Sequence, residues 1–229
     1  MASDTDALQT GAEQIVERFP ALDRLGICRA AFIKRIPGIE VTNDKAEVLK
    51  RLETAHRAAN INLGMRDWPL LTAEQVHGSK IVVVDAPTRN DRHFSGYDGF
   101  ITNQPRVALG VYVADCCAVY FVDPKIKVAG LVHSGKKGTQ SQIAAKAIQA
   151  LKQHFGSNPS DLVVQLSPCI RPPHYEVDFA AQIREQCRAA GVTQIHDSEV
   201  CTACDLKSYY SYRAEKGKTG RMLALLGLL

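Results

Sequence analysis

Hydrophobic residues follow two different spacings along the chain. In residues 7–19 and 45–59 they recur every three or four positions, which predicts two amphipathic surface helices. From Lys80 onward the pattern changes to short β-branched runs bounded by turn residues, which predict strands. The predicted strands are Ile81–Val84, Gly99–Thr102, Val107–Val122, Val128–Val132 and Leu162–Leu166. The middle of the chain is therefore expected to form a sheet.

Two further helices are predicted between and after these strands. One covers about 141–155, and the other begins after an N-cap at Asp178 and stops at Gly191. Residues 209–229 are read as a hairpin whose last strand closes the sheet. Helices that alternate with strands favour a layered α/β or α+β fold with a mixed sheet. No repeat or linker divides the sequence, so residues 1–229 are expected to form one domain.

The run Val107–Val122 is apolar except for a carboxylate, Asp115, near its middle. A straight strand of that length would span about 53 Å, so we expect a bend near Gly110 or Asp115. Asp115 either caps a turn in a core strand or contributes to a buried polar site. Neighbouring strand residues point to opposite faces, so Cys116 and Cys117 serve the same site only if the chain kinks between them.

Composition and charge argue against a membrane-spanning, a nucleic-acid-binding or a secreted protein. The chain has 229 residues, is 45% hydrophobic and 23% charged, and has a formal net charge of +4. No apolar run reaches the roughly 18 residues of a membrane span, and no basic cluster suggests nucleic-acid binding. The first twenty residues are acidic and lack an apolar core, so they do not resemble a signal peptide and a cytosolic location is expected. A small anionic ligand fits this charge best.

The seven cysteines do not indicate a disulfide framework. An odd number cannot pair fully within one chain, and a reducing compartment favours buried thiols, metal ligands or nucleophiles. Cys201 and Cys204 form a CxxC motif without a second such motif, and we read them as two buried or surface thiols.

One loop is a candidate anion site. The predicted strand ending at His133 runs into Ser134-Gly-Lys-Lys-Gly138 and then into a helix. Exposed amides of Gly135 and Gly138, the helix N-terminus and the charges of Lys136 and Lys137 would suit phosphate. The loop lacks the Walker pattern, and a plain connection is the alternative interpretation.

Three separated residues suggest a metal site. His77 lies in a turn at a strand edge, Cys116 lies beside Asp115, and His133 ends a strand. Two imidazoles and a thiolate suit zinc, with a fourth position left to water. Their separations of 39 and 17 residues match no short metal motif, so spacing alone does not decide whether they meet.

Several segments occur together in an order that is typical of one family. They are Gln75–Gly78, Asp98–Thr102, Ala114–Cys116, His133–Gly138, Ser167–Ile170 with Tyr175–Val177, and Ser211–Arg213 with Gly220–Met222. On these motifs the chain resembles the YfiH-like family, long labelled multicopper polyphenol oxidase or laccase-like and now associated with purine nucleoside phosphorylase and adenosine deaminase activities.

The resemblance implies a fold and a metal. It implies a layered domain of mixed β-sheets with helices packed outside, and a zinc held by His77, Cys116 and His133. It thereby selects Cys116 over Cys117. The sequence departs from the family at His133-Ser-Gly-Lys-Lys-Gly138, where the family has His-Ala-Gly-Trp-Arg-Gly, and at Cys117-Ala118. Lysine offers an anion a point charge in place of arginine's fork, so substrate choice and phosphate use are affected.

The leading hypothesis is a zinc-dependent enzyme acting on purine nucleosides. Its nucleophile would be a metal-activated water attacking adenosine, or a bound phosphate attacking the ribose. Lys136, Lys137 and the amides of Gly135 and Gly138 would hold substrate or phosphate. Asp115 and Lys137 are the candidate catalytic residues, Asp115 by orienting a ligand or relaying a proton, with Asp98 as a further candidate for that task.

Two other functions remain open, and copper is not expected. A Cys/His hydrolase would use Cys116 as nucleophile and His133 as base on an amide such as a peptidoglycan precursor. A binding protein without catalysis would fit the altered loop. Multicopper sites use many histidines, often as His-x-His pairs, whereas this chain has seven histidines and no such pair.

Overall fold

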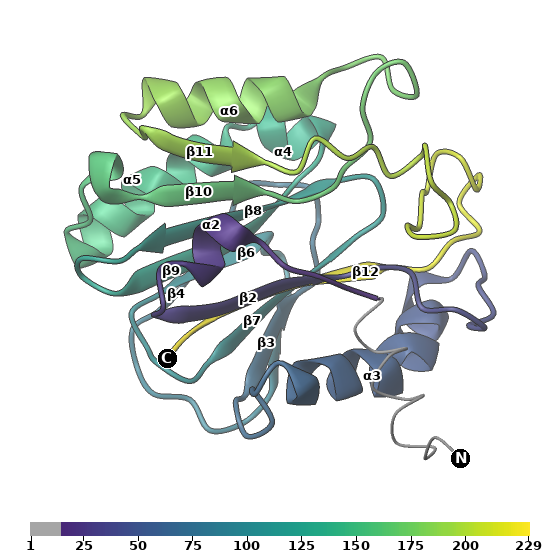
Figure 1. Cartoon of the computed structure of the whole chain (residues 1–229), viewed down its shortest axis with the longest axis horizontal. Coiled ribbons are helices and arrows are strands. Elements are labelled where there is room, and N and C mark those ends of the chain that lie inside the picture. The colour runs from purple at the N-terminus through teal and green to yellow at the C-terminus, as the bar shows by residue number, and fades with distance from the viewer. Residues whose placement is uncertain (1–14) are drawn as a thin grey trace.

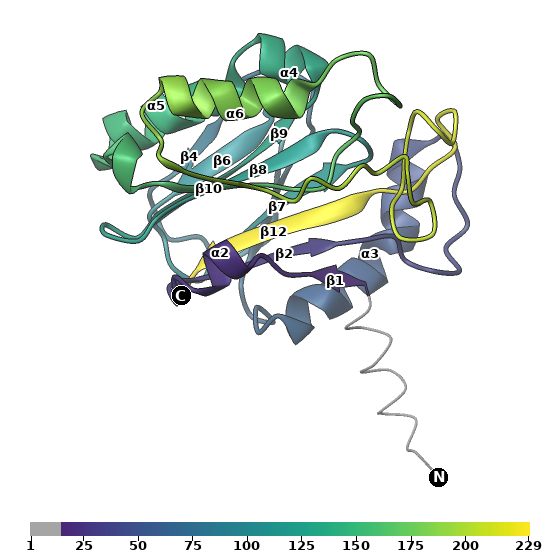
Figure 2. The same ribbon diagram turned by 45° about the horizontal axis from the view of Figure 1, so that its top comes forward.

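The computed structural model describes residues 15–229 and arranges them in four layers. Helix α3 (Lys45–Asn62) covers one sheet, a second sheet packs on the first, and α5 (Ile143–Phe155) and α6 (Phe179–Ala189) cover the second sheet (Figure 1, Figure 2). Each sheet has six strands and contains both parallel and antiparallel pairs, which confirms the predicted mixed α/β class. The two sheets also confirm the layered arrangement of mixed β-sheets with helices packed outside that the resemblance implies, whereas the apolar pattern alone predicted one sheet.

The first sheet is built around the C-terminal strand. Its order is β1 (Val16–Glu17), β2 (Cys28–Ile33), β12 (Met222–Leu228), β7 (Ala108–Val113), β3 (Leu70–Ala73) and β5 (Arg92–Phe94). Strand β12 pairs antiparallel with both β2 and β7, and all seven of its residues are buried. A strand covered on both faces reads as a continuous apolar run, which explains why this segment shows no alternation.

The second sheet is built around two long hydrophobic strands. Its order is β11 (Gln194–Asp197), β10 (Val163–Leu166), β8 (Cys117–Asp123), β9 (Val128–Ser134), β6 (Gly99–Thr102) and β4 (Val82–Val84). Side chains of β8 alternate between two cores: Tyr120 packs toward the first sheet, whereas Val119 and Phe121 pack toward the helices. The alternation is expected because successive strand residues point to opposite faces.

Helix boundaries follow their capping residues. The Asp44 side chain accepts hydrogen bonds from the amides of Ala46 and Glu47 at the start of α3. Asp178 caps α6 through the amide of Ala181, which confirms the predicted N-cap. The helix predicted over 141–155 is α5, and the five-residue helix α4 (Lys136–Gln140) precedes it. Within residues 15–229, the remaining helices are α2 (Pro20–Asp23) and a 3-10 turn at Pro159–Asp161.

The chain passes from one sheet to the other between Val113 and Cys117. Strand β7 ends in the first sheet, and β8 begins in the second. Asp115 lies between them with a left-handed backbone, φ 82°. The predicted bend is therefore confirmed at Asp115, whereas Gly110 lies inside β7. The kink separates the two cysteines, because Cys117 enters the core beneath the helices and Cys116 stays at the crossing.

Two predicted elements are wrong. Of the helix predicted over 7–19, residues 7–14 lie outside the described residues, and Val16–Glu17 form a strand that pairs with β2. Phe19 is extended because it precedes Pro20. The C-terminal hairpin does not form, since residues 209–221 contain no strand and β12 occupies the interior of the first sheet.

The apolar pattern alone left four strands unpredicted. They are β2, β3, β5 and β11, in addition to β1, which lies where a helix was predicted. Among the described residues, no helix combines the length and apolar character that crossing a membrane requires.

The central position of β12 predicts a stability effect. Leu226 is fully buried opposite Ala30 and Leu109, so Leu226→Ala leaves a cavity and is expected to cost about 2–5 kcal/mol of unfolding free energy. Leu229→Ala, three residues later at 52% exposure, is the matched control and should change stability by less than about 0.5 kcal/mol. Urea unfolding of both variants measures the difference, and equal midpoints would contradict the central placement.

Candidate functional site

The three residues predicted as metal ligands meet at the place where the chain crosses between sheets. One ligand atom from each of His77, Cys116 and His133 lies within 4.8 Å of the other two. The two imidazole rings are 4.8 Å apart at their centroids and inclined by 78°. His77 comes from the turn before β4, Cys116 from the crossing and His133 from the end of β9. The fold therefore brings together donors that are far apart in the sequence.

Asp98 orients both histidines. One carboxylate oxygen, Oδ1, lies 3.0 Å from His133 Nδ1 and accepts from the His77 amide at 2.8 Å. The other oxygen accepts from the Gly78 amide at 2.8 Å. The carboxylate is fully buried, and these contacts hold its pKa below the usual value although burial opposes them. Because Nδ1 of His133 faces Asp98, its Nε2 is the nitrogen available for a metal.

The turn that holds His77 is fixed from a second direction. Gln75 and His77 both have left-handed backbones, with φ of 62°. The buried Gln75 amide accepts from the Tyr112 backbone N–H at 2.9 Å and donates to the Tyr112 carbonyl. The Gln75 side chain thus pairs with the backbone of β7 as a neighbouring strand would. These hydrogen bonds tie the turn to the first sheet.

Gly135 leaves the space that the thiol occupies. A Cβ at this position would lie 2.4 Å from Cys116 Sγ, which is closer than any side chain tolerates. The residue was predicted to contact substrate, and the structure places it against the candidate metal ligand. A glycine in the loop after β9 is therefore required by close approach to sulfur, not by an unusual φ.

Charge in the site favours a thiolate. Burial raises the pKa of Cys116, but the neighbouring imidazoles of His133 and His77 outweigh this and lower it to about 6. Burial lowers the pKa of His133, but Cys116 and Asp98 raise it to about 9. Without a metal, the pair is thus held as thiolate and imidazolium. Deprotonation of this thiol is the step that metal binding requires.

The donor set fits a metal ion. Ligands around tetrahedral zinc lie about 3.5 Å from one another, given metal–ligand bonds of about 2.0–2.3 Å. The three ligand atoms here lie within 4.8 Å of one another, so small side-chain rotations bring them to a common ion. His77 is exposed and Cys116 half-buried, which leaves room for a further ligand on the open side.

The open side faces a cavity of about 850 Å³. Its lining is rich in cations and aromatic rings. The basic side chains are Lys45, Lys136, Lys137, Arg213, Lys216 and Arg221, the aromatic ones are Tyr112, Tyr175, Phe179 and Tyr212, and the carboxylates are Asp115 and Glu176. A cavity with this lining suits an anionic ligand with a planar group.

The basic side chains differ in how far they are already paired. Glu176 binds Arg213 at 2.7 Å and Lys136 at 3.4 Å. Within residues 15–229, no carboxylate lies within 4.0 Å of Arg221 or Lys137. The Arg221 guanidinium is half-buried and donates to the carbonyls of Thr219 and Gly220. Arg221 and Lys137 therefore have charge available for an anion.

Asp115 lines the cavity and fastens the C-terminal loops. Its Oδ1 accepts from the Thr202 hydroxyl and its Oδ2 from the Arg213 amide, both at 2.7 Å. Lys136 and Lys137 line the cavity from the start of α4. Gly138 is buried in the same short helix and is absent from the cavity lining within the described residues.

Several functional candidates were not singled out by the sequence. Gln75, Tyr175, Tyr212, Arg213 and Arg221 all lie in the motifs that gave the resemblance. Their presence in those motifs was the available signal. Which of them reach the cavity depends on long loops whose course the sequence does not indicate.

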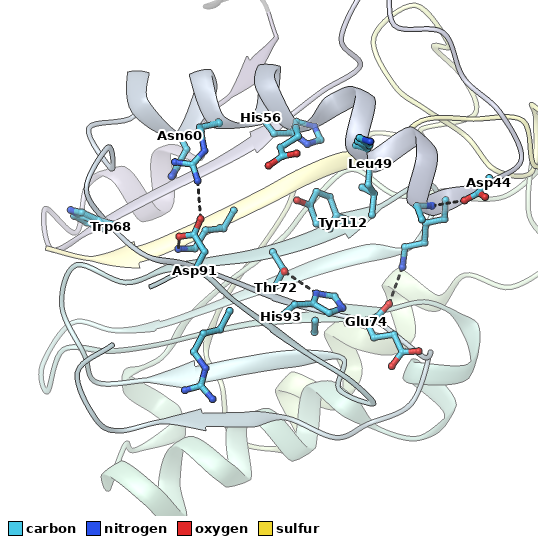
Figure 3. Close-up of a pocket in the computed structure, with 18 residues that line it drawn as sticks. Asp44, Leu49, His56, Asn60, Trp68, Thr72, Glu74, Asp91, His93 and Tyr112 are labelled. Atoms are coloured by element: carbon cyan, nitrogen blue, oxygen red, sulfur yellow. Dashed lines mark hydrogen bonds and ion pairs between the residues drawn. The ribbon is translucent and has the colours of Figure 1, made fainter. Parts of the chain in front are cut away.

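A second hollow lies along α3, with a volume of about 770 Å³ (Figure 3). It shares Lys45 and Tyr112 with the first cavity and is lined by His56, whose pKa is lowered to about 4 by burial. Thr72 and His93 are hydrogen-bonded on its floor, as Figure 3 shows. None of the residues predicted for the site line this hollow.

Comparisons with known proteins agree with the motifs. A family model described as "Multi-copper polyphenol oxidoreductase laccase" matches residues 24–182 and 177–229. The chain is 30% identical to "Purine nucleoside phosphorylase YlmD" of Geobacillus stearothermophilus, over 88% of this chain and 86% of that protein. It is 27% identical to the protein of the same name from Bacillus subtilis, over 89% and 85%.

The fold is also that of a solved relative. The crystal structure of YlmD from Geobacillus stearothermophilus superposes with a TM-score of 0.80 at 26% identity, covering 93% of this chain and 98% of that one. The resemblance found in the motifs is thereby confirmed.

The charge coupling predicts how Cys116 reacts with pH. In metal-free protein, alkylation of Cys116 by iodoacetamide should reach half its maximal rate near pH 6, because the thiolate is the reactive form. The His133→Ala variant removes the imidazolium, so the midpoint should move up toward about 8.5. Peptide mass spectrometry resolves each cysteine, and Cys204 serves as internal control since its neighbour Cys201 raises its pKa. An equal midpoint for Cys116 in both proteins would contradict the coupling.

Proposed function

The chain belongs to the family described as multi-copper polyphenol oxidoreductase laccase, and we propose that it is a zinc-dependent enzyme that cleaves purine nucleosides with phosphate. Two relatives named purine nucleoside phosphorylase support the substrate class. The observation that supports it best is the opening of the His77, Cys116 and His133 cluster onto a cavity with unpaired basic side chains.

Zinc is proposed on the chemistry of the donors. Thiolate and imidazole are the ligands that zinc prefers, and three protein ligands with an open position are typical of catalytic sites. When bound, zinc would supply Lewis acidity to an oxygen of the substrate or of phosphate. Asp98 would keep His133 in the tautomer that presents Nε2, and it would fix the His77 turn through two amide hydrogen bonds.

Phosphate is proposed to bind between the cluster and the C-terminal loop. Arg221 offers a guanidinium fork from a half-buried position, and Lys137 adds a second charge from the start of α4. Phosphate would gain charge-assisted hydrogen bonds there without displacing an ion pair within the described residues. Arg221 would thus supply the fork that Lys137 lacks at the position where the family has arginine.

The purine is proposed to lie against the aromatic side of the cavity. Tyr175, Phe179 and Tyr212 line it together, and Arg213 sits over the Tyr175 ring with its guanidinium carbon 5.0 Å from the centroid. Flat aromatic faces stack on a base at about 1–3 kcal/mol per contact. Such a surface holds the base while the ribose faces the phosphate.

Phosphorolysis of the glycosidic bond suggests a role for each of two residues, Lys137 and Asp115. An oxygen of monohydrogen phosphate forms a bond to C1′ of the ribose, the bond from C1′ to the purine nitrogen breaks, and the proton lost by the phosphate ends on the purine nitrogen. In this proposal Lys137 holds the attacking phosphate and is the catalytic cation. Asp115 acts as a positioning residue, because its two oxygens fasten Thr202 and the backbone of Arg213 beside Cys116.

The function is tested with purified protein and two nucleosides. Inosine and adenosine should yield free base and ribose 1-phosphate only when phosphate is present, and the protein should contain zinc. The His77→Ala variant should lose the zinc of this cluster and at least tenfold of the turnover, whereas His154→Ala, an exposed histidine on α5, should keep both. Full turnover in zinc-free protein would overturn the zinc dependence. Release of ammonia from adenosine without phosphate would instead identify hydrolytic deamination by the same site.

The role of Arg221 predicts a change in one kinetic constant. In Arg221→Met the KM for phosphate should rise at least tenfold, with a smaller change in the KM for inosine, because the variant removes the anion fork and leaves the aromatic surface. Arg188→Met on the exposed face of α6 is the matched control and should alter neither constant. Equal increases in both KM values would contradict a phosphate-binding role.

A thiol hydrolase is the second candidate, and the thiolate–imidazolium pair of Cys116 and His133 favours it. It would attack an amide such as that of a peptidoglycan precursor. Turnover that survives metal chelation and is abolished by alkylation of Cys116 would establish this function in place of phosphorolysis.

A further inference from the structure

A second set of metal-ligating side chains lies outside the cluster described above. His174 Nδ1 is 3.5 Å from Cys204 Sγ and 3.7 Å from Cys201 Sγ. One ligand atom from each of the three residues lies within 4.8 Å of the other two. The residues come from two loops, one after β10 and the other after β11.

We propose that His174, Cys201 and Cys204 form a second zinc site, which fastens the loop after β10 to the loop after β11. The two distances from the His174 nitrogen to the sulfurs, 3.5 and 3.7 Å, are those expected for tetrahedral zinc, whose ligands lie about 3.5 Å apart. Two thiolates and an imidazole neutralise the charge of the ion, and binding releases the two thiol protons. His174 and Cys204 are exposed, so water can take the fourth position.

The backbone prepares both loops for this arrangement. The amides of His174 and Tyr175 both donate to the Arg171 carbonyl, at 2.9 and 3.2 Å. In the other loop the Cys204 amide donates to the Cys201 carbonyl at 3.1 Å, and this turn places the two sulfurs on one side. Ligands that are ordered before binding lose less conformational entropy when the ion binds.

The position of His174 distinguishes a metal site from a disulfide. A disulfide between Cys201 and Cys204 would need the two sulfurs only, whereas the imidazole nitrogen lies at nearly equal distance from both. A shared ion is the simplest partner for all three atoms. Zinc is favoured over harder cations because thiolates are soft ligands.

The loop that would be fastened forms a wall of the main cavity. Tyr175 and Glu176 follow His174 directly and line that cavity. Glu176 also binds Arg213, and the Thr202 hydroxyl donates to Asp115. A zinc ion at this point would therefore hold the aromatic wall in place. This consequence, unlike the site itself, rests on the proposed function.

Metal analysis of the full chain tests the site without any assay of activity. The protein should hold two zinc ions, and Cys204→Ser or His174→Ala should reduce the number to one. In a His77→Ala/Cys116→Ser/His133→Ala background, one zinc should remain, and adding Cys204→Ser should weaken its binding at least tenfold. The matched control is His154→Ala in the same background, which should keep the ion. Circular dichroism checks that each variant is folded.

Cobalt provides a second readout, which also applies if the triple variant fails to fold. Titration of Co²⁺ into chelator-treated protein should give thiolate charge-transfer absorption, and Cys204→Ser should remove most of it, since two of the three thiolates belong to this site. Zinc content of one in the wild type together with unchanged absorption in Cys204→Ser would overturn the proposal. So would an intact mass lower by two hydrogens, which indicates a disulfide, or copper or iron in place of zinc.

The consequence for the cavity is measured separately. Cys204→Ser should raise the KM for inosine severalfold while leaving kcat nearly unchanged, because the wall loosens and the phosphate site is intact. If the wild type shows two zinc ions but no phosphorolysis, the proposed function fails and the second site stands. If zinc is lost and KM does not change, the site stands but does not hold the wall.

Discussion

The buried carboxylate of Asp98 connects the parts of the molecule on which the candidate site depends. It accepts from the backbone of the His77 turn through two amides and contacts Nδ1 of His133. A charged group with no exposed surface is stable only when donors surround it, and here every donor belongs to a segment that presents a metal ligand or lies next to one. The hydrogen bonds that this carboxylate needs therefore fix the His77 turn and the His133 ring. Gly135 leaves space for the Cys116 sulfur, which lies beside the two imidazoles.

The crossing between the two sheets places the neighbouring residues Cys116 and Cys117 in different environments. Cys116 and Cys117 are adjacent, yet the left-handed backbone of Asp115 sends one thiol toward the cavity and the other into the core beneath α5 and α6. Adjacent thiols thereby acquire different environments. The thiol beside the imidazoles has a lowered pKa, whereas the pKa of the buried Cys169, next to Cys117, is raised. The pKa of each thiol therefore depends on where its cysteine lies relative to the two sheets.

The family label names copper, whereas zinc is the metal proposed here for the donors at the crossing. The label refers to multiple coppers, but the donors at the crossing are two imidazoles and one thiolate within a single cluster. The cavity beside them has six basic side chains and two carboxylates, and part of this positive charge is unpaired within the described residues. Such a charge balance favours an anionic reactant next to the metal ligands. The basic side chains around the cluster are therefore suited to an anion.

The sequence alone determined the elements whose signals are local. The strands β4, β6, β8, β9 and β10, the helix α6 with its Asp178 cap and the bend at Asp115 all follow from periodicity, capping and burial of single segments. The sequence also grouped His77, Cys116 and His133, through the motifs and the preferences of zinc for its ligands. Tertiary structure decided the rest. It split the strands into two sheets, placed β12 in the interior of the first, and moved Val16–Glu17 from a predicted helix into a strand. It also brought His174 to Cys201 and Cys204 and left Arg221 without a carboxylate partner in residues 15–229. These features depend on pairings between segments far apart in the chain, and a local pattern of apolar and polar residues contains no information about which distant segment supplies the partner.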